Sequence, residues 1–287
     1  MAVAPDGSIF YCLGTANKIG QILSPSVAGD KLNVREFPIP TINSFPEGIT
    51  VAPDGIVWFT EQRSGKIARL DPKDGVFSEY PTPTVNSGPV GITVGPDNNI
   101  WFTEAYANKI GVLDPNNPET IKEFRIPTLV SAPIYITSGP DGGLWYVGVR
   151  SHKLGRIDPR SFEFVEYPTM TRQAGPTSVI TGPDGALWLS ELAVDKIARF
   201  DVSARRFTDE IPVESKRMAP GRVQACLSMA PTAISGSQRC LAIRSADSIP
   251  RPKRFMSFKR QAQPRYRWLI PDPRIRPKTF IRRPTCS

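Results

Sequence analysis

The chain has 287 residues, four cysteines and a formal net charge of +9, a length that suffices for one large or two ordinary domains with an ample core. It contains no run of about eighteen apolar residues, which argues against a membrane-spanning helix. The residues after Met1 lack the basic and apolar regions of a signal peptide, and the cysteine spacing fits neither a paired zinc site nor a dense disulfide framework.

The charge divides the chain into two kinds of sequence. Residues 216–287 hold 17 of the 36 Lys and Arg residues but only two of the 27 acidic residues, which gives that segment a net charge of +15 and leaves the remainder at −6. We therefore expect an acidic body over residues 1–214 and a separate basic, Arg- and Pro-rich tail over residues 215–287.

Three short markers recur along the body with one period. The first marker, for example "APDGIVWFTE", places aspartates at Asp6, Asp54, Asp97, Asp141 and Asp184. The second, for example "GKIA", places lysines at Lys18, Lys66, Lys109, Lys153 and Lys196. Both series are spaced by 48, 43, 44 and 43 residues, and a third marker such as "EYPTP" closes each copy. A period in the low forties is typical of four-stranded propeller blades.

Within one copy, the residue types predict four strands in chain order. "GITV" at 48–51 reads as a short inner strand that runs into a Pro-Asp-Gly turn, and "IVWFT" at 56–60 reads as a strand buried on both faces. "KIARLD" at 66–71 alternates polar with apolar residues, which suits a third strand nearer the surface. The prolines of "EYPTP" at 79–83 belong at a sheet edge, so this strand is outermost. The body is therefore expected to be an all-β propeller.

The copies differ in a few places along the chain. The first copy enters part-way through the inner strand, with Met1 at the position of Ile49. The longer first gap predicts a loop insertion near residues 23–32. One tryptophan position is shared by Trp58, Trp101, Trp145 and Trp188, which we expect to pack between neighbouring blades. The only histidine, His152, falls in the turn between the second and third strands of the fourth copy. We expect it to serve the backbone shape of that turn and not to act as a base, because Asn, Gly and Asp occupy the equivalent positions.

The repeat ends near Glu214, and the tail shows no strand alternation. A basic arm for nucleic acid, with Tyr266 and Trp268 available for base stacking, is one interpretation. A disordered appendage is a second. We favour a third, a sequence read out of frame or through an intron that replaces further blades, and we expect no nucleic-acid function.

The pattern "P-x-G-I-T-V-G-P-D-G-x-x-W-F-T-E-x-x-x-N-K-I-G" resembles the virginiamycin B lyases, also called streptogramin lyases. The resemblance implies a seven-bladed propeller, of which about five blades are visible here. It also implies a Mg2+-dependent elimination that linearises a streptogramin B depsipeptide, an antibiotic-resistance activity. In that reaction a histidine removes a proton beside the carbonyl, and Mg2+, held partly by glutamate, supports the charge on oxygen.

The resemblance places the histidines at the x of "P-x-G-I" in two consecutive late blades, which correspond to the stretch that the tail occupies here. It places the metal-linked glutamate at the end of "W-F-x-E". The x positions of this chain are Glu47, Val90, Ile134 and Thr177, and the second-strand ends are Leu13, Glu61, Glu104, Gly148 and Glu191. No catalytic residue is therefore assigned. Glu47 and Glu61 are candidate oxygen ligands for Mg2+. A propeller has a central channel lined by the inner strands of its blades, and the resemblance places the site at one mouth of this channel. We expect four further side chains at that mouth: Glu104, Glu191, Val90 and Thr177. The alternative for the three second-strand glutamates is a hydrogen-bonded carboxylate that organises the next turn.

These residues favour a lyase-like propeller that is inactive because the histidines are missing. The alternatives are a non-catalytic propeller that binds a ligand or protein across its mouth, and a gluconolactonase-like hydrolase, for which several acidic and amide metal ligands would be needed. We expect a small-molecule ligand at the mouth, no membrane association and a monomer. The sequence does not indicate a compartment.

Overall fold

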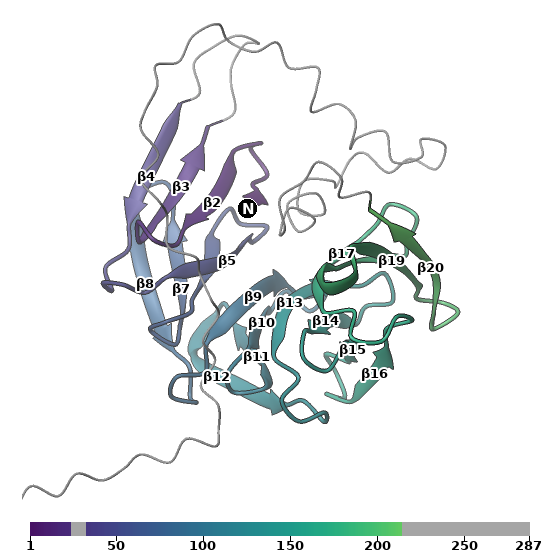
Figure 1. Cartoon of the computed structure of the whole chain (residues 1–287). Helices are drawn as coiled ribbons and strands as arrows, with labels where there is room; N and C mark the ends of the chain where they lie inside the picture. Colours follow the sequence, from purple (N-terminus) through teal and green to yellow (C-terminus); the bar gives the residue numbers. More distant parts are fainter. Residues whose placement is uncertain (24–32, 214–287) are drawn as a thin grey trace, which may run out of the picture. The chain divides into compact units, whose positions relative to one another are not determined.

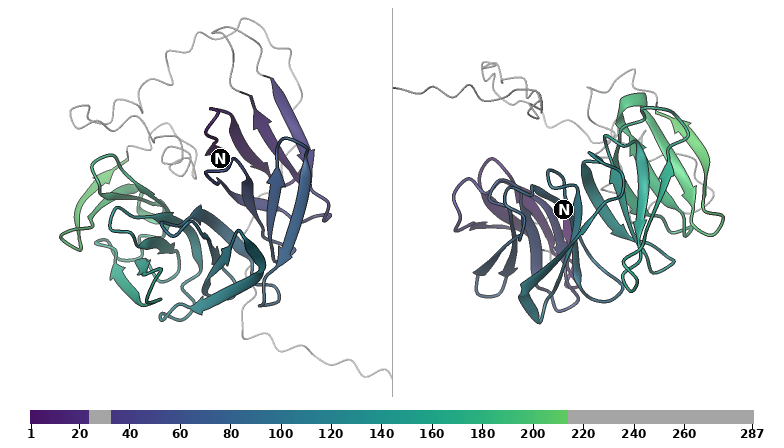
Figure 2. Two further views of the ribbon diagram at one scale, coloured as in Figure 1. Left: turned by 180° about the vertical axis from the view of Figure 1, so that it is seen from behind. Right: turned by 90° about the horizontal axis from the view of Figure 1, so that it is seen from below.

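The structure, a computed structural model, describes residues 1–23 and 33–213. The predicted loop insertion beyond Leu23 and the basic tail lie outside these residues. The described strands form five antiparallel sheets of four strands each, and every sheet is built from four consecutive strands (Figures 1 and 2). The all-β propeller fold with four-stranded blades is confirmed.

Each blade runs from an inner first strand to an outer fourth strand. Blade 1 contains β1 (Ala2–Val3), β2 (Ile9–Leu13), β3 (Lys18–Ile22) and β4 (Val34–Pro38). Blade 2 contains β5 (Pro46–Val51), β6 (Val57–Glu61), β7 (Lys66–Asp71) and β8 (Val76–Pro81). Blade 3 contains β9 (Pro89–Val94), β10 (Ile100–Glu104), β11 (Lys109–Asp114) and β12 (Asn117–Arg125). Blade 4 contains β13 (Pro133–Ser138), β14 (Leu144–Gly148), β15 (Lys153–Ile157) and β16 (Phe164–Pro168). Blade 5 contains β17 (Pro176–Thr181), β18 (Leu187–Glu191), β19 (Lys196–Asp201) and β20 (Arg206–Pro212), with a short 3-10 helix at Leu192–Val194.

The strand order and burial match the sequence expectations. The second strand is buried along its whole length in blades 2, 3 and 4, and the proline-containing fourth strand is the outermost. In blade 1, Ala2 pairs with Phe10 as Thr50 pairs with Trp58, so β1 has the predicted register. The described part of the chain contains no helix long and apolar enough to cross a membrane.

In blades 1, 3 and 4 the second marker ends in Gly because an aromatic ring covers that position. Gly20, Gly111 and Gly155 pair across the sheet with Tyr11, Phe102 and Tyr146. A Cβ atom on Gly111 would lie 2.2 Å from the Phe102 ring, far inside van der Waals contact. The glycine of "KIG" is therefore required because a large aromatic side chain on the neighbouring strand occupies the space that a Cβ atom would need.

The blades pack face to face through the shared tryptophan position. Trp58 of blade 2 packs with Ile92 and Phe102 of blade 3, and Trp145 of blade 4 packs with Phe200 of blade 5. Trp58, Trp101 and Trp145 are at most 1% exposed, which confirms that they pack between blades. Trp188 of blade 5 belongs to a small hydrophobic cluster of the described residues in which Ile197 is the buried member.

Candidate functional site

The inner strands share a distortion at the "P-x-G" positions. In blade 2 the register with β6 shifts between Pro46 and Ile49, which frees the Gly48 amide from the sheet. That amide donates to Thr60 Oγ1 at 2.9 Å, and Thr60 Oγ1 donates in turn to the carbonyl of Val90 on the next blade at 2.9 Å. Blade 3 repeats the arrangement through Thr103. Second-strand hydroxyls therefore fix the x positions of consecutive inner strands relative to each other.

The x positions carry four different side chains. Val90 is 3% exposed, and Thr177 is 8% exposed and shares a hydrogen bond with Ser190. Ile134 is half-buried. Glu47 is half-buried, and its Oε2 has no hydrogen-bond partner among the described residues. Burial raises the pKa of Glu47 to about 7. Glu47 is therefore the one x-position side chain of the four that can hold or transfer a proton.

The second-strand glutamates all lie at the same end of their blades as these x positions. Glu61 pairs across the sheet with Pro46 on one side and Lys66 on the other. Ser64, in the turn ahead, donates to Glu61 Oε2 at 2.7 Å, so the turn-organising interpretation is confirmed for Glu61. Burial, opposed by the Ser64 bond, raises the pKa of Glu61 to about 7.

Glu104 and Glu191 differ from Glu61. Both are fully buried, and neither carboxyl oxygen of either residue has a hydrogen-bond partner within residues 1–23 and 33–213. The turn-organising interpretation is wrong for these two, because the turns after β10 and β18 place no hydroxyl where Ser64 stands. Burial and then the neighbouring Glu123 raise the pKa of Glu104 to about 8, and burial and then Glu210 raise that of Glu191 to about 7.

A repeated polar cluster surrounds these glutamates, and the sequence analysis missed it. In blade 3, Lys109 Nζ donates to Glu123 and to Thr84 Oγ1, while Thr84 donates its own backbone N–H and hydroxyl to Glu123. Thr84 belongs to the segment that follows blade 2, so the cluster joins two blades. We call this Lys–Glu–Thr group the inter-blade clasp. Its members are Lys66, Glu79 and Thr41; Lys109, Glu123 and Thr84; Lys153, Glu166 and Thr128; Lys196, Glu210 and Thr171.

The signal for the clasp was present in the repeat. Its lysine is the second residue of the second marker, its glutamate opens the third marker, and its threonine follows the third marker of the copy before. Blade 1 has the pair Lys18–Glu36 at 2.6 Å without a threonine among the described residues, and both side chains are exposed, at 39% and 45%. The equivalent pair of Lys109 and Glu123 is 20% and 8% exposed.

The residues do not fit a Mg2+ site. Mg2+ needs oxygen ligands that converge in near-octahedral geometry. Within the described residues no group of three His, Cys, Asp or Glu side chains is arranged to hold a metal ion. Of the two candidate ligands, Glu61 accepts a hydrogen bond from Ser64 at Oε2, so Glu47 Oε2 and Glu61 Oε1 are the two oxygens without a partner among the described residues, too few for such a geometry. The same shortage applies to the several ligands that a gluconolactonase-like site needs.

His152 lies in the predicted turn with φ of 54°, and its equivalents Asn17, Gly65, Asn108 and Asp195 have φ between 50° and 65°. The backbone interpretation is confirmed. The His152 Nδ1 accepts the Gly175 N–H at 3.1 Å, and its carbonyl accepts the N–H of Thr169. Asn17 holds Ser44 of the next connection in the same manner. His152 therefore fastens the connection between blades 4 and 5.

The buried glutamates predict an unusual pH dependence of stability. Because the folded pKa of Glu104 is raised to about 8, the unfolded chain releases this proton at lower pH than the folded chain. The corresponding stability is complete below about pH 4.5 and is lost as the pH rises through about 8. We expect Glu104→Gln to raise the free energy of unfolding at pH 8.5 by about 1–2 kcal/mol and to change it far less at pH 5. Urea denaturation at both pH values measures this.

The matched control is Glu119→Gln on β12, where the side chain is exposed. The free energy of unfolding of this control variant should depend on pH as that of the wild-type chain does. The prediction would be contradicted if the free energy of unfolding of Glu104→Gln differed from that of the wild type by the same amount at pH 5 and at pH 8.5.

Residues 1–226 match the model of the virginiamycin B lyase family, a stretch that extends past the predicted end of the body. A structure of virginiamycin B lyase from Staphylococcus aureus is 36% identical, with a TM-score of 0.67 over 74% of this chain and 68% of that chain. A catalytically inactive histidine-to-alanine variant of the same lyase with quinupristin is also 36% identical, with a TM-score of 0.68 over 75% of this chain and 69% of that chain. A streptogramin B lyase structure is 34% identical, with a TM-score of 0.69 over 75% of this chain and 68% of that chain.

Matches at low identity show only the fold. A chain of the nidogen/laminin complex is 16% identical with a TM-score of 0.60 over 75% of this chain and 79% of that chain. A comparison with curated proteins gave no match.

Proposed function

Because the chain belongs to the virginiamycin B lyase family, we propose that it is a lyase-type propeller that has lost the elimination reaction and keeps a ligand-binding mouth. One observation carries this proposal. The resemblance assigns the proton-abstracting histidines to the x position of two late blades, whereas the x positions found in this chain hold Glu47, Val90, Ile134 and Thr177, and the single histidine, His152, lies in a turn. The related lyase in which one histidine is replaced by alanine is described as catalytically inactive, which supports the importance of such a residue.

The chemistry explains why these residues are insufficient. Removal of a proton beside a carbonyl needs a base with a pKa near neutrality and a fixed positive charge or donor for the developing oxyanion. The side chains of Val90 and Ile134 cannot accept a proton, and the Thr177 hydroxyl is engaged with Ser190. The clasp lysines are bonded to Thr and Glu oxygens, so they do not supply the free charge. Because Glu47 and Glu61 do not fit Mg2+, no step is assigned to a metal.

Binding at the mouth is supported by Glu47. Its Oε2 is buried without a partner among the described residues, and a buried polar atom left unpaired costs stability. A ligand that donates a hydrogen bond to Glu47 would recover part of that cost. Glu47 with a pKa of about 7 also meets one requirement for a general base, which makes proton transfer by Glu47 the second candidate function.

The decisive test is ring opening of quinupristin by the purified full-length chain with Mg2+, followed by liquid chromatography and mass spectrometry. Elimination gives an isomer of the same mass with a new retention time, whereas hydrolysis adds one water. We expect neither product above the rate without protein, with the Staphylococcus aureus lyase as the positive control.

Formation of the isomer by this chain would contradict the proposal, and its disappearance in Glu47→Gln would then assign the base to Glu47. Binding is measured separately by titration of quinupristin into wild type, Glu47→Gln and Glu119→Gln. Retained affinity in Glu119→Gln with at least about fivefold weaker binding in Glu47→Gln supports a binding mouth.

A further inference from the structure

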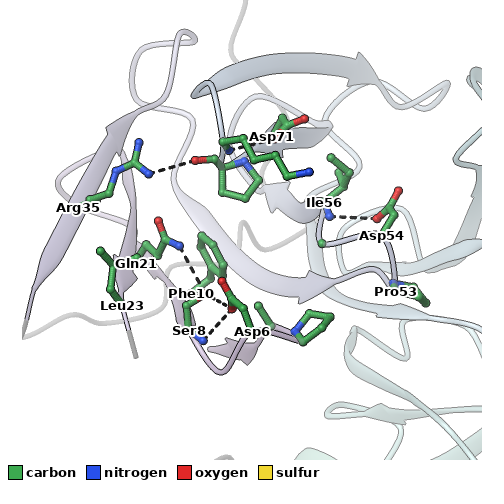
Figure 3. Close-up of a pocket in the computed structure, with 15 residues that line it drawn as sticks. Asp6, Ser8, Phe10, Gln21, Leu23, Arg35, Pro53, Asp54, Ile56 and Asp71 are labelled. Atoms are coloured by element: carbon green, nitrogen blue, oxygen red, sulfur yellow. Dashed lines mark hydrogen bonds between the residues drawn. The ribbon is translucent and has the colours of Figure 1, made fainter. Parts of the chain in front are cut away.

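A cavity of about 410 Å3 lies between blades 1 and 2, away from the mouth. Its walls include the turn after β1 with Asp6, the turn after β5 with Asp54, and the turn after β7 with Pro72 and Lys73 (Figure 3). These turns lie at the ends of the strands opposite to Glu61, since neighbouring strands run antiparallel. The cavity is therefore separate from the site of the proposed function, and the inference below does not depend on that function.

Blades 4 and 5 show a side-chain group that fills the equivalent position. In blade 4, Trp145 pairs across the sheet with Arg156, and both side chains bond to Asp141, with Arg156 Nε donating to Oδ2 at 2.7 Å. Blade 5 repeats the arrangement with Trp188, Arg199 and Asp184. Blades 4 and 5 thus share a Trp–Arg–Asp group, whereas Val112 takes the position of the arginine in blade 3.

Blade 1 replaces two members of this group. Phe10 stands in place of tryptophan and Gln21 in place of arginine, and the two pair across β2 and β3. Both replacements are shorter, and both line the cavity. The cavity therefore lies where blade 1 lacks both the tryptophan and the arginine that blades 4 and 5 contain.

The Gln21 amide is oriented by a chain of hydrogen bonds. Ser8 Oγ donates to Asp6 Oδ1 at 2.7 Å, so the serine has a lone pair left for Gln21 Nε2 at 3.4 Å. The Gln21 Oε1 is turned away from Ser8 (Figure 3). Gln21 is 4% exposed, and its Oε1 has no partner within the described parts of the chain. The buried wall of the cavity therefore presents an acceptor that needs a donor from whatever enters.

The charges around the cavity favour a cationic donor. Three carboxylates line it, Asp6, Asp54 and Asp71. The hydrogen bonds from Ser8 hold the pKa of Asp6 below its usual value, so it is ionised at neutral pH. Two cationic side chains also line the cavity, Arg35 and Lys73, so the carboxylates exceed them by one. Arg35 donates to the Pro72 carbonyl at 3.2 Å and lies 4.9 Å from the Phe37 ring centre.

The remaining lining is apolar and includes the Phe10 ring and Ile56. We propose that this cavity binds a small organic ammonium compound with an aromatic or aliphatic body. The ammonium N–H of this compound donates to Gln21 Oε1, and the carboxylates balance its charge. The aromatic or aliphatic part of the compound packs against Phe10 and Ile56. A volume of 410 Å3 falls within the usual range of small-molecule pockets.

The first test compares three probes of similar shape and different charge: benzylammonium, benzyl alcohol and benzoate. Each is titrated into the full-length chain and followed by ligand-observed NMR at low salt. We expect benzylammonium to bind about tenfold more tightly than benzyl alcohol, and benzoate to bind least. Equal or tighter binding of benzoate, or no saturable binding of benzylammonium, would overturn the proposal.

The second test places the site. Gln21→Arg should rebuild the group of blade 4, with the new guanidinium bonded to Asp6, and should weaken benzylammonium binding at least about tenfold. Gln21→Met keeps the volume of the side chain and removes the acceptor, and it should also weaken binding. The control is Val112→Arg, the same repeat position opposite Trp101 in blade 3, which should bind as the wild type does.

Undiminished binding by both Gln21 variants overturns the proposal, and so does an equal loss in Val112→Arg. The melting temperature of each variant accompanies the titration. Gln21→Arg is expected to melt no lower than the wild type because it recreates an arrangement that blades 4 and 5 already contain.

Discussion

Lys109→Met is expected to lower the free energy of unfolding by about 3 kcal/mol at pH 7, because it leaves a buried carboxylate without its cation. The Glu123 side chain is 8% exposed and Lys109 Nζ is its charged partner. Burial works to raise the pKa of Glu123, but the bonds from Lys109 and from Thr84 outweigh it and hold the pKa below its usual value. Their contribution is present above about pH 4.5 and lost as the pH falls further, so the destabilisation should shrink in acid.

The repeat supplies the control for this measurement. Lys18→Met removes the equivalent lysine of blade 1, where both partners are exposed and the described residues provide no threonine. Its cost should stay below about 1 kcal/mol, as is usual for surface ion pairs. Chemical denaturation followed by tryptophan fluorescence measures both variants. Equal effects of the two substitutions would show that burial of the clasp carries no extra stability.

Trp145→Ala is expected to lower the free energy of unfolding by about 4 kcal/mol, the range found for large aromatic residues removed from a core. The Trp145 ring is 1% exposed and lies 5.8 Å from the Tyr167 ring and 5.3 Å from the Phe200 ring of the next blade. Its Nε1 also donates to Asp141 at 2.9 Å. The substitution therefore removes contacts within blade 4 and between blades 4 and 5.

Trp188→Ala is the matched variant. This tryptophan has the same repeat position and donates to the equivalent aspartate, Asp184, but it is only half-buried, with the Arg199 guanidinium 5.9 Å from its ring. A cost of about 1 kcal/mol is expected. Thermal and urea denaturation of both variants test the difference, and a Trp188→Ala cost as large as that of Trp145→Ala would contradict it.

The fold was predictable because each marker reports a local requirement. The residue at the position of His152 must adopt positive φ, and the glycine of "KIG" must admit a ring from the next strand. Both requirements act within a few residues or across one pair of strands. Repetition at a constant period then sets the strand order of every blade, which is why the sequence predicted β5 to β8 and its counterparts correctly.

The candidate sites were less predictable because they depend on contacts between copies. Thr84 follows the third marker of one copy but completes a cluster in the next, so alignment of the copies does not reveal its partner. The sequence places Ser64 three residues after Glu61 and Ala107 three residues after Glu104, but only the structure shows that the serine hydroxyl reaches the carboxylate. The replacements at Phe10 and Gln21 read as ordinary divergence until the structure placed a cavity beside them.

The inter-blade clasp also determines how such a chain can be divided or duplicated. Each clasp begins with a threonine behind one blade and ends with a glutamate on the outer strand of the next, for example Thr41 and Glu79. A gene segment that starts at Pro46, where β5 begins, contains a whole sheet but separates Thr41 from its partners. A segment that starts before Thr41 carries both. Duplication, grafting or permutation of blades should therefore preserve stability best when the junction lies between the end of one blade's outer strand and the threonine that follows it, for example between Pro38 and Thr41.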